Sequence, residues 1–198
     1  MDYYNTIESS AIAEFKDRGS KFLAYSFPLK TVKEFKEHVR DLKKEHPKAG
    51  HFCFAYKIGV DGNIFRSSDD GEPSGTGGKP ILGQVESKNL TDILIVVVRY
   101  FGGTLLGVPG LINAYKTAAS LVIQCTPVVQ KVVEIKYDLH FNYTEMNEVM
   151  RLIKQYNCTI YKNETQLFCI IHTGIPKNQL EEVLSAFKEV RNLEMNPL

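Results

Sequence analysis

The chain has 198 residues, of which 43% are hydrophobic and 24% charged, and its formal net charge is +1. This composition is close to the globular average and excludes a disordered chain, and the small net charge gives no overall attraction to nucleic acid. The N-terminal segment contains early acids and no continuous apolar stretch, and the longest apolar run, Ile93 to Val98, is too short to cross a bilayer. We therefore expect a cytoplasmic protein that has no membrane partner.

The first third of the chain predicts two hairpins separated by a helix. The expected elements are strands 6–15 and 21–27, a helix 31–46 and a strand hairpin 51–68. Gly19 and the pair Asp61-Gly62 supply the turn residues of the hairpins, and Pro47 ends the helix. The helix has one apolar stripe, and we interpret its many charges as a solvated face.

The middle of the chain alternates glycine-rich loops with regular elements. The expected elements are a loop 67–82, a short helix 81–88, a strand 92–101, a glycine loop 102–110 and a helix 111–125. Pro80 favours the first turn of the short helix. The stretch "ILIVVVRYF" is apolar on both faces, which is typical of a central strand.

A new pattern begins after Pro127. It predicts a strand 131–141, a helix opened by Asn142 with Glu145 as a capping-box partner, strands 158–161 and 166–172, a helix after Pro176 and a short last strand. This order is that of a ferredoxin-like unit. We therefore expect an α+β protein with two domains, residues 1–128 and 129–198.

The four cysteines show no metal-like spacing and predict reduced, mostly buried thiols. Cys158 and Cys169 would stand opposite each other if their hairpin turned at Asn163-Glu164.

The glycine loop 102–110 lies between a strand and a helix, an arrangement whose backbone N–H groups can hold a phosphate. It is not a Walker loop, because Val108 and Pro109 stand where Lys and Ser or Thr are required, and its glycines are wrongly spaced for a dinucleotide site. Two interpretations stay open. The loop binds an RNA or DNA phosphate, with Arg99, Lys116 and Lys79 as counter-charges, or it only turns a strand into a helix.

The distribution of charged residues along the chain favours residues 73–131 as the location of any polyanion site. Residues 51–72 hold two basic and four acidic residues, whereas residues 73–131 hold five basic and two acidic ones. Arg99 ends an apolar run, so its charge needs a partner. We favour an ion pair with one of the acids Asp69, Asp70 and Glu72 over a bound ligand phosphate.

Those three acids also suggest a magnesium site, although acids in turns usually accept bonds from their own backbone. A nucleophile at Cys53, with His51, or at Ser74 is not favoured. No catalytic residue, metal or cofactor is therefore expected.

Four motifs carry a resemblance to the Impact/YigZ family. They are "RGSKFLAYSFPL", "HFCFAYKIG", "DDGEPSGTGGKPIL" and "VVVRYFGGTLLGVPGLINAYKTAA". The resemblance implies an N-terminal α+β domain of the type seen in a ribosomal protein and elongation factor G, followed by a ferredoxin-like domain. It also implies translation regulation, since eukaryotic members compete for the activator of a starvation-sensing kinase, and nucleic-acid or ribosome binding is suggested for bacterial members. Gly77, Pro109 and Asn113 depart from the residues usual in the family.

The resulting functional hypothesis is a translation-linked regulator that binds RNA, the ribosome or a regulatory protein through a cleft of the first domain, with no prediction of oligomeric state. The alternative is a metal-assisted hydrolase of a small phosphorylated or peptide-like substrate that uses the three acids. The predicted cleft residues are Asp69, Asp70, Glu72, Ser74, Gly75, Lys79, Arg99, Gly102, Gly103, Gly107 and Lys116.

Overall fold

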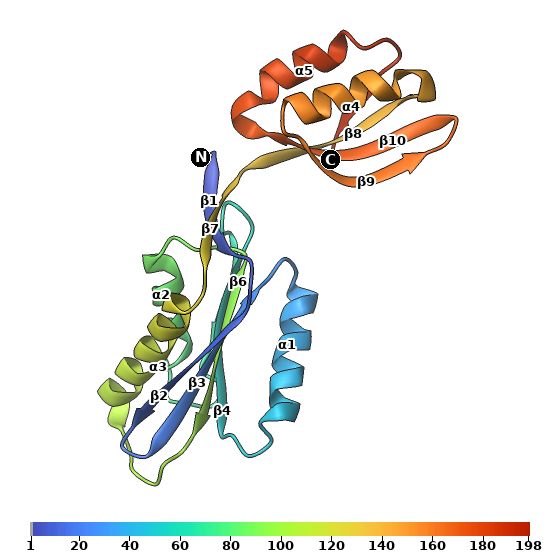
Figure 1. Ribbon diagram of the computed structural model, residues 1–198. Helices are drawn as coiled ribbons and strands as arrows, with labels where there is room; N and C mark the ends of the chain where they lie inside the picture. The colour runs from blue at the N-terminus through green and yellow to red at the C-terminus, as the bar shows by residue number, and fades with distance from the viewer. Residues whose placement is uncertain (1) are drawn as a thin grey trace. The chain divides into compact units, whose positions relative to one another are not determined.

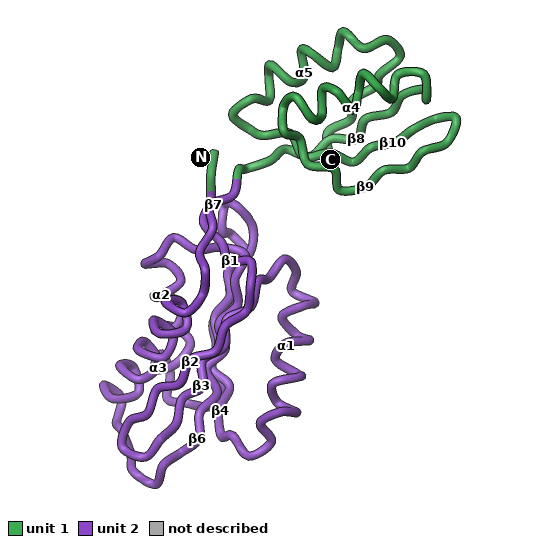
Figure 2. The backbone as a smooth tube through the Cα atoms, in the orientation of Figure 1, with its two compact units in different colours: residues 1–3, 132–198 green, residues 4–131 purple. Residues whose placement is uncertain are grey.

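The computed structural model describes residues 2–198, which form two compact units. One comprises residues 4–131, and the other comprises residues 132–198 together with Asp2 and Tyr3 (Figure 2). The division falls inside strand β7 (Val128–Val132), and the sequence-based boundary after residue 128 lies at the start of that strand. Strand β7 pairs with β1 (Tyr3–Ile7) in a two-stranded sheet.

The unit 4–131 is built on a five-stranded antiparallel sheet in the order β2-β3-β6-β4-β5. Its strands are β2 (Ala11–Asp17), β3 (Ser20–Pro28), β4 (His51–Ile58), β5 (Ile64–Ser68) and β6 (Ile93–Tyr100). Helix α1 (Val32–Glu45) covers one face, and α2 (Gly78–Ser87) and α3 (Gly107–Gln124) cover the other (Figure 1).

Strand alternation divides the core of this unit into two layers. In β4, Cys53 and Ala55 point to the α2 and α3 side, whereas Phe52, Phe54 and Tyr56 point to α1. The predicted central strand is confirmed, because β6 lies in the middle of the sheet and residues 93–99 are buried. Its apolar side chains therefore serve both core layers.

The remaining predicted elements of this unit are present with shifted ends. The expected strand 6–15 is interrupted at residues 8–10, where β1 ends before β2 begins. Helix α3 begins at Gly107, four residues earlier than expected, so Pro109 lies in its first turn, where a proline costs no hydrogen bond. The glycine loop is therefore shorter than its sequence suggested.

The second unit has the β-α-β-β-α-β order predicted for a ferredoxin-like fold, and its sheet order is β11-β8-β10-β9. The elements are β8 (Glu134–Asn142), α4 (Met146–Gln155), β9 (Thr159–Thr165), β10 (Phe168–Pro176), α5 (Leu180–Lys188) and β11 (Glu194–Pro197). Both helices pack on one face of this sheet (Figure 1). The α+β fold class is thus confirmed.

Two local expectations in this unit are wrong. The Asn142 side chain makes no capping bond, and a 3₁₀ turn, Tyr143–Glu145, precedes α4 instead. The hairpin turns at Gln166-Leu167, which pairs Cys169 with Thr165 and leaves Cys158 outside the ladder. All four cysteines are free, and three of them are buried, as expected, whereas Cys125 is exposed.

No helix within residues 2–198 combines the length and the apolarity needed to cross a membrane.

Candidate functional site

The candidate site lies at one end of the five-stranded sheet, where the β2–β3 turn, the loop 69–77 and the loop 101–106 meet. The turn and the last loop touch directly, because a Cβ at Gly102 would lie 1.9 Å from the carbonyl carbon of Gly19. Gly19 has a φ of +80°, as its predicted turn role requires. Glycine at both positions therefore permits a backbone contact that any side chain would prevent.

A buried ion pair joins the loop 69–77 to the end of β6, directly before the loop 101–106. Nη1 of Arg99, at the end of β6, lies 2.6 Å from Oε1 of Glu72, and the two residues are 5% and 9% exposed. The hydroxyl of Tyr115, on α3, donates to the same carboxylate oxygen over 2.7 Å. The predicted pairing of Arg99 with a loop acid is confirmed, and Glu72 is the partner.

The guanidinium of Arg99 also reaches the β2–β3 turn. Its Nη2 donates to Oγ of Ser20 over 3.4 Å, and the backbone N–H of Gly102 donates to the same oxygen over 3.2 Å. The rings of Phe22 and Phe101 lie 5.5 and 5.7 Å from the guanidinium carbon. Arg99 is thus enclosed by protein groups, which leaves its planar fork unavailable to a ligand phosphate.

Burial keeps the neighbouring groups of this network neutral. Desolvation, helped by the nearby Cys53 and Glu72, raises the pKa of Tyr115 far above its ordinary value, so its hydroxyl remains a donor. Desolvation also raises the pKa of Cys53 to about 12. Its thiol donates to the carbonyl oxygen of Asp69 over 3.0 Å, so Cys53 has the chemistry of a structural thiol rather than of a nucleophile.

Asp69 organises the glycine-rich loop. Its carboxylate accepts hydrogen bonds from the backbone N–H groups of Gly75, Gly77 and Gly78, at 2.8, 2.9 and 2.8 Å. Burial opposes the charged form, but these three donors outweigh it and lower the pKa of Asp69. The acid therefore holds the loop against the first turn of α2, where backbone N–H groups lack helical partners.

Asp70 ties the same loop to the first residues of β4. It has a φ of +42°, and its Oδ2 accepts from the backbone N–H of Phe52 over 2.8 Å. Its carbonyl oxygen accepts a hydrogen bond from Nδ1 of His51 over 2.9 Å. Nζ of Lys43 lies 3.5 Å from its other carboxylate oxygen.

The three acids that were considered as metal ligands, Asp69, Asp70 and Glu72, therefore have three separate sets of partners. Among residues 2–198 no group of three or more His, Cys, Asp or Glu side chains has the geometry to hold a metal ion. Each of these acids fixes the loop to a different part of the unit. Their carboxylates are not grouped around one point, so their arrangement does not support the hydrolase alternative.

The other predicted cleft residues divide between the loops of this end, where Gly75 donates to Asp69, and the helices α2 and α3. Ser74 and Lys79 are exposed, and Gly75, Gly103 and Gly107 have positive φ angles. Lys116 points away from the network, because it lines a shallow groove of about 230 Å³ between α2 and α3, with Gln84 and Asn113 among its neighbours. The structure brings the loop acids, Arg99 and Gly102 together but places the exposed lysines on the helices.

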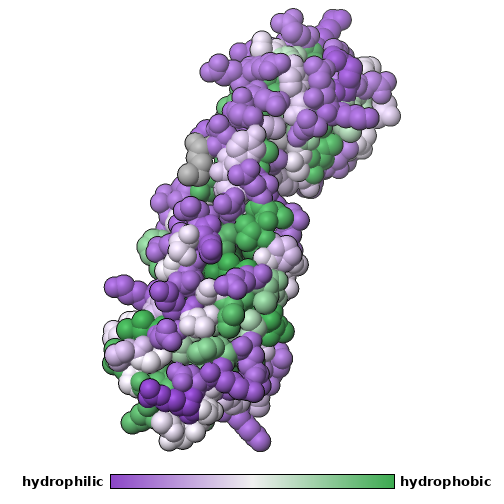
Figure 3. Space-filling model, turned by 60° about the vertical axis from the view of Figure 1, so that its left-hand side comes forward, coloured by the Kyte–Doolittle hydropathy of each residue, from purple (hydrophilic) through white to green (hydrophobic). Residues whose placement is uncertain are grey.

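Exposed apolar side chains at this end were missed from the sequence. Leu105 is 82% exposed, Phe101 is 57% exposed, and Val108 is also exposed. The signal was present in "FGGTLLGV", where apolar residues alternate with glycine in a loop that contains no basic residue. Apolar residues also gather in patches on the face of the molecule shown in Figure 3.

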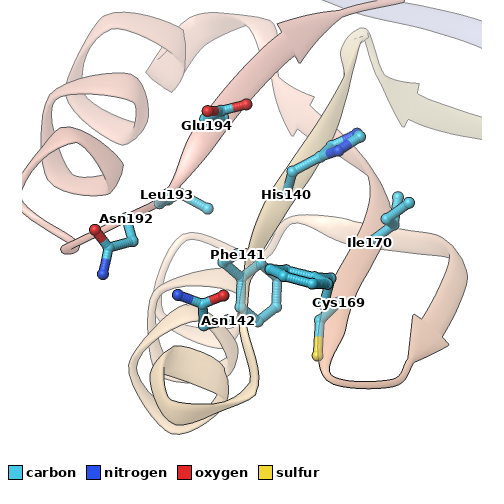
Figure 4. Close-up of a pocket in the computed structure, with 9 residues that line it drawn as sticks. His140, Phe141, Asn142, Cys169, Ile170, Asn192, Leu193 and Glu194 are labelled. Carbon is cyan, nitrogen blue, oxygen red and sulfur yellow. The ribbon is translucent and has the colours of Figure 1, made fainter.

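The second unit has a cavity of its own, of about 470 Å³, lined by His140, Phe141, Asn142, Phe168, Cys169, Ile170, Asn192, Leu193 and Glu194 (Figure 4). His140 and Glu194 pair across β8 and β11, so they project from the same face of the sheet. Phe168 is 72% exposed. None of the predicted site residues belongs to this cavity.

Residues 18–123 match the family model of the Impact N-terminal domain. Because the match spans more than half of the chain, the protein belongs to the IMPACT family.

Relatives extend the similarity over nearly the full length. An IMPACT family member of Haemophilus influenzae is 31% identical over 96% of this chain and 93% of its own. The IMPACT family member YigZ of Escherichia coli is 34% identical over 84% of this chain and 81% of its own. The crystal structure of a hypothetical protein, 28% identical, superposes with a TM-score of 0.77 and covers 100% of this chain and 98% of that one.

One of the departures from the usual family residues has a structural reason. A Cβ at Gly77 would lie 2.6 Å from Sγ of Cys53, so alanine at position 77 would require the thiol or the loop to shift. Asn113 is exposed beside Lys116 in the groove between α2 and α3.

Proposed function

We propose that this protein is a translation-linked regulator that acts by binding, and that the loop end of the unit 4–131 contacts a protein of the translating ribosome. Membership of the IMPACT family supports the link to translation, because translation regulation is the role that the family resemblance implies. The observation that supports the loop end as the contact surface is the exposure of Leu105. This leucine is almost fully exposed, and its loop is anchored by a buried ion pair.

A protein partner suits this surface better than RNA does. Phe101, Leu105 and Val108 offer exposed apolar area, which is typical of protein–protein contact. The Arg99–Glu72 pair and the glycine contact below them hold the loop in place, so little conformational entropy remains to be lost on binding. RNA binding would instead depend on Lys79 and Lys116, the exposed cations of α2 and α3.

Co-sedimentation with ribosomes from a cleared lysate tests this proposal. Leu105→Glu places a charge at the centre of the surface, and we expect it to lower the sedimented fraction at least about fivefold. Leu167→Glu is the matched control, because Leu167 is 78% exposed on the second unit. Sedimentation of both variants at the wild-type level, or its absence for the wild-type protein, would contradict the proposed contact.

Fluorescence anisotropy with a short RNA, at low and at physiological salt, distinguishes the RNA alternative. Phosphate contacts would make the affinity fall steeply with salt and would make it sensitive to Lys79→Gln and Lys116→Gln. That outcome, with Leu105→Glu unaffected, would replace the protein partner by RNA.

A further inference from the structure

Helix α1 carries its charges on two separate flanks. An α-helix turns by about 100° per residue, and with Phe35 and Leu42 directed into the core, residues of one sign fall together. The basic flank comprises Lys33, Lys36, Arg40, Lys43 and Lys44. The acidic flank comprises Glu34, Glu37, Asp41 and Glu45. A merely solvated face, as interpreted from the sequence, does not require this separation.

Contacts with the sheet show which way each flank faces. His38, beside the acidic flank, stacks on Phe27 of β3 with ring centroids 4.2 Å apart. On the other side, Nζ of Lys43 lies 5.4 Å from the ring centroid of Phe52 in β4. Because the sheet order is β3-β6-β4-β5, the basic flank faces the edge formed by β4 and β5.

A groove of about 510 Å³ lies along this basic flank. Its lining residues are Phe35, Lys36, Val39, Arg40, Lys43 and Lys44. The lining combines apolar side chains with four cations. Asp41 lies 3.3 Å from Nε of Arg40 and 3.5 Å from Nζ of Lys44, and Asp70 lies 3.5 Å from Nζ of Lys43, so these exposed ion pairs offset part of the positive charge.

Strand β5 adds to the same side of the sheet. Arg66 pairs with Tyr56, whose ring belongs to the core layer under α1, and its guanidinium carbon lies 5.9 Å from the ring centroid of Phe54. Ile64, next on this face of β5, is 53% exposed. The edge strand therefore also offers a cation and an apolar group.

The chemistry of the groove defines its occupant. Single-stranded RNA binds where its bases can stack on free aromatic faces, but the ring of Phe35 is buried against Phe54 and Tyr56, with centroids 4.6 and 4.8 Å away. An apolar floor with a cationic rim instead complements a segment that carries both aliphatic and acidic side chains. We propose that the groove along the basic flank of α1, with Arg66 of β5 on the same side of the sheet, binds an acidic amphipathic segment of a partner protein. This surface adjoins the loop 69–77 through the contact of Lys43 with Asp70, but the proposal does not depend on the function proposed for the exposed apolar residues of the loop end.

Selection from a phage-displayed library of random dodecapeptides on the full-length protein tests the proposal. We expect the selected peptides to be rich in Asp or Glu together with Leu, Ile or Phe, and their affinity, measured by anisotropy, to fall as salt rises. The double variant Lys36→Glu/Arg40→Glu should weaken binding of a selected peptide at least about tenfold, because it replaces attraction by repulsion at two rim positions. Glu37→Gln, on the acidic flank, is the matched control and should bind as the wild type does.

The apolar floor has its own test. Val39→Ala removes two methyl groups from the lining and should weaken a selected peptide by about threefold to tenfold without changing the salt dependence. Amide chemical shifts of the wild-type protein should move at Val39 and Arg66 when the peptide is added.

Three results would overturn the proposal. One is a selection that yields no binding peptides or only peptides without acidic residues. Another is unchanged binding by Lys36→Glu/Arg40→Glu. The third is a short oligouridine that displaces the peptides and binds more tightly than they do, which would make the groove a nucleic-acid site.

Discussion

Two regions of the unit 4–131 contain charged side chains in different environments. At the loop end, Arg99 and Glu72 are buried against each other, whereas on α1 the side chains of Lys36 and Arg40 are exposed. A buried charge that loses its partner is strongly destabilising, while exposed charges are hydrated and screened. The buried loop network therefore contributes to stability, whereas the exposed α1 flank is available for the proposed binding.

The largest effect is expected from Glu72→Gln. This change keeps the volume of the side chain but leaves the buried Arg99 without a counter-charge, and it should lower the free energy of unfolding by about 3–5 kcal/mol. Urea unfolding followed through amide signals of residues 4–131 measures it. Glu37→Gln makes the same chemical change on the α1 surface and should stay within about 0.5 kcal/mol. A loss under about 1 kcal/mol for Glu72→Gln would break the comparison.

The next largest effect is expected from Asp69→Asn, which should lower the free energy of unfolding by about 2–3 kcal/mol near neutral pH. Asparagine keeps one acceptor oxygen but presents an N–H₂ group where the carboxylate accepts from backbone N–H groups. The pKa of Asp69 is lowered in the folded protein, so its contribution is complete above the ordinary value of 3.8 and is lost as the pH falls through the folded value. The stability gap between the wild-type protein and the variant should therefore narrow in acid. A gap that widened as the pH was lowered below 4 would refute this account.

Tyr115→Phe should lower the free energy of unfolding by about 1.5 kcal/mol. It removes one hydrogen bond to a charged acceptor while the ion pair to Glu72 stays. Thermal unfolding of the double variant Tyr115→Phe/Glu72→Gln tests whether the two residues are coupled. Because residues of one network are coupled, the double variant should lose less stability than the sum of the losses of the two single variants. Additive losses would mean that the tyrosine does not belong to the network.

The smallest stability effect is expected on α1. Lys36→Gln/Arg40→Gln should change the free energy of unfolding by no more than about 0.5 kcal/mol, since both side chains are exposed. The same urea titration checks it. A loss as large as that of Glu72→Gln would show that the flank is structural and would remove the contrast between the regions.

Local patterns in the sequence were sufficient for most of the elements and for part of the site, but they did not separate β1 from β2 or reveal β7 before β8. Helices and strands followed from the spacing of apolar residues, and the two-faced apolar run of β6 identified the central strand. The need of Arg99 for a partner also followed, because a charge at the end of a buried strand must be compensated wherever the chain folds. These conclusions depend on neighbours in the sequence.

Tertiary structure decided which groups meet. Three adjacent acids were equivalent candidates for Arg99, and the folded loop separates them, giving Asp69 to the start of α2, Asp70 to β4 and Glu72 to the interior. Likewise, the charge pattern of α1 is visible in the sequence, but its basic flank faces an open sheet edge only because β4 and β5 lie on that side. Strand order and loop closure arise from contacts between residues far apart in the chain, and the sum of many such contacts is not contained in any local pattern.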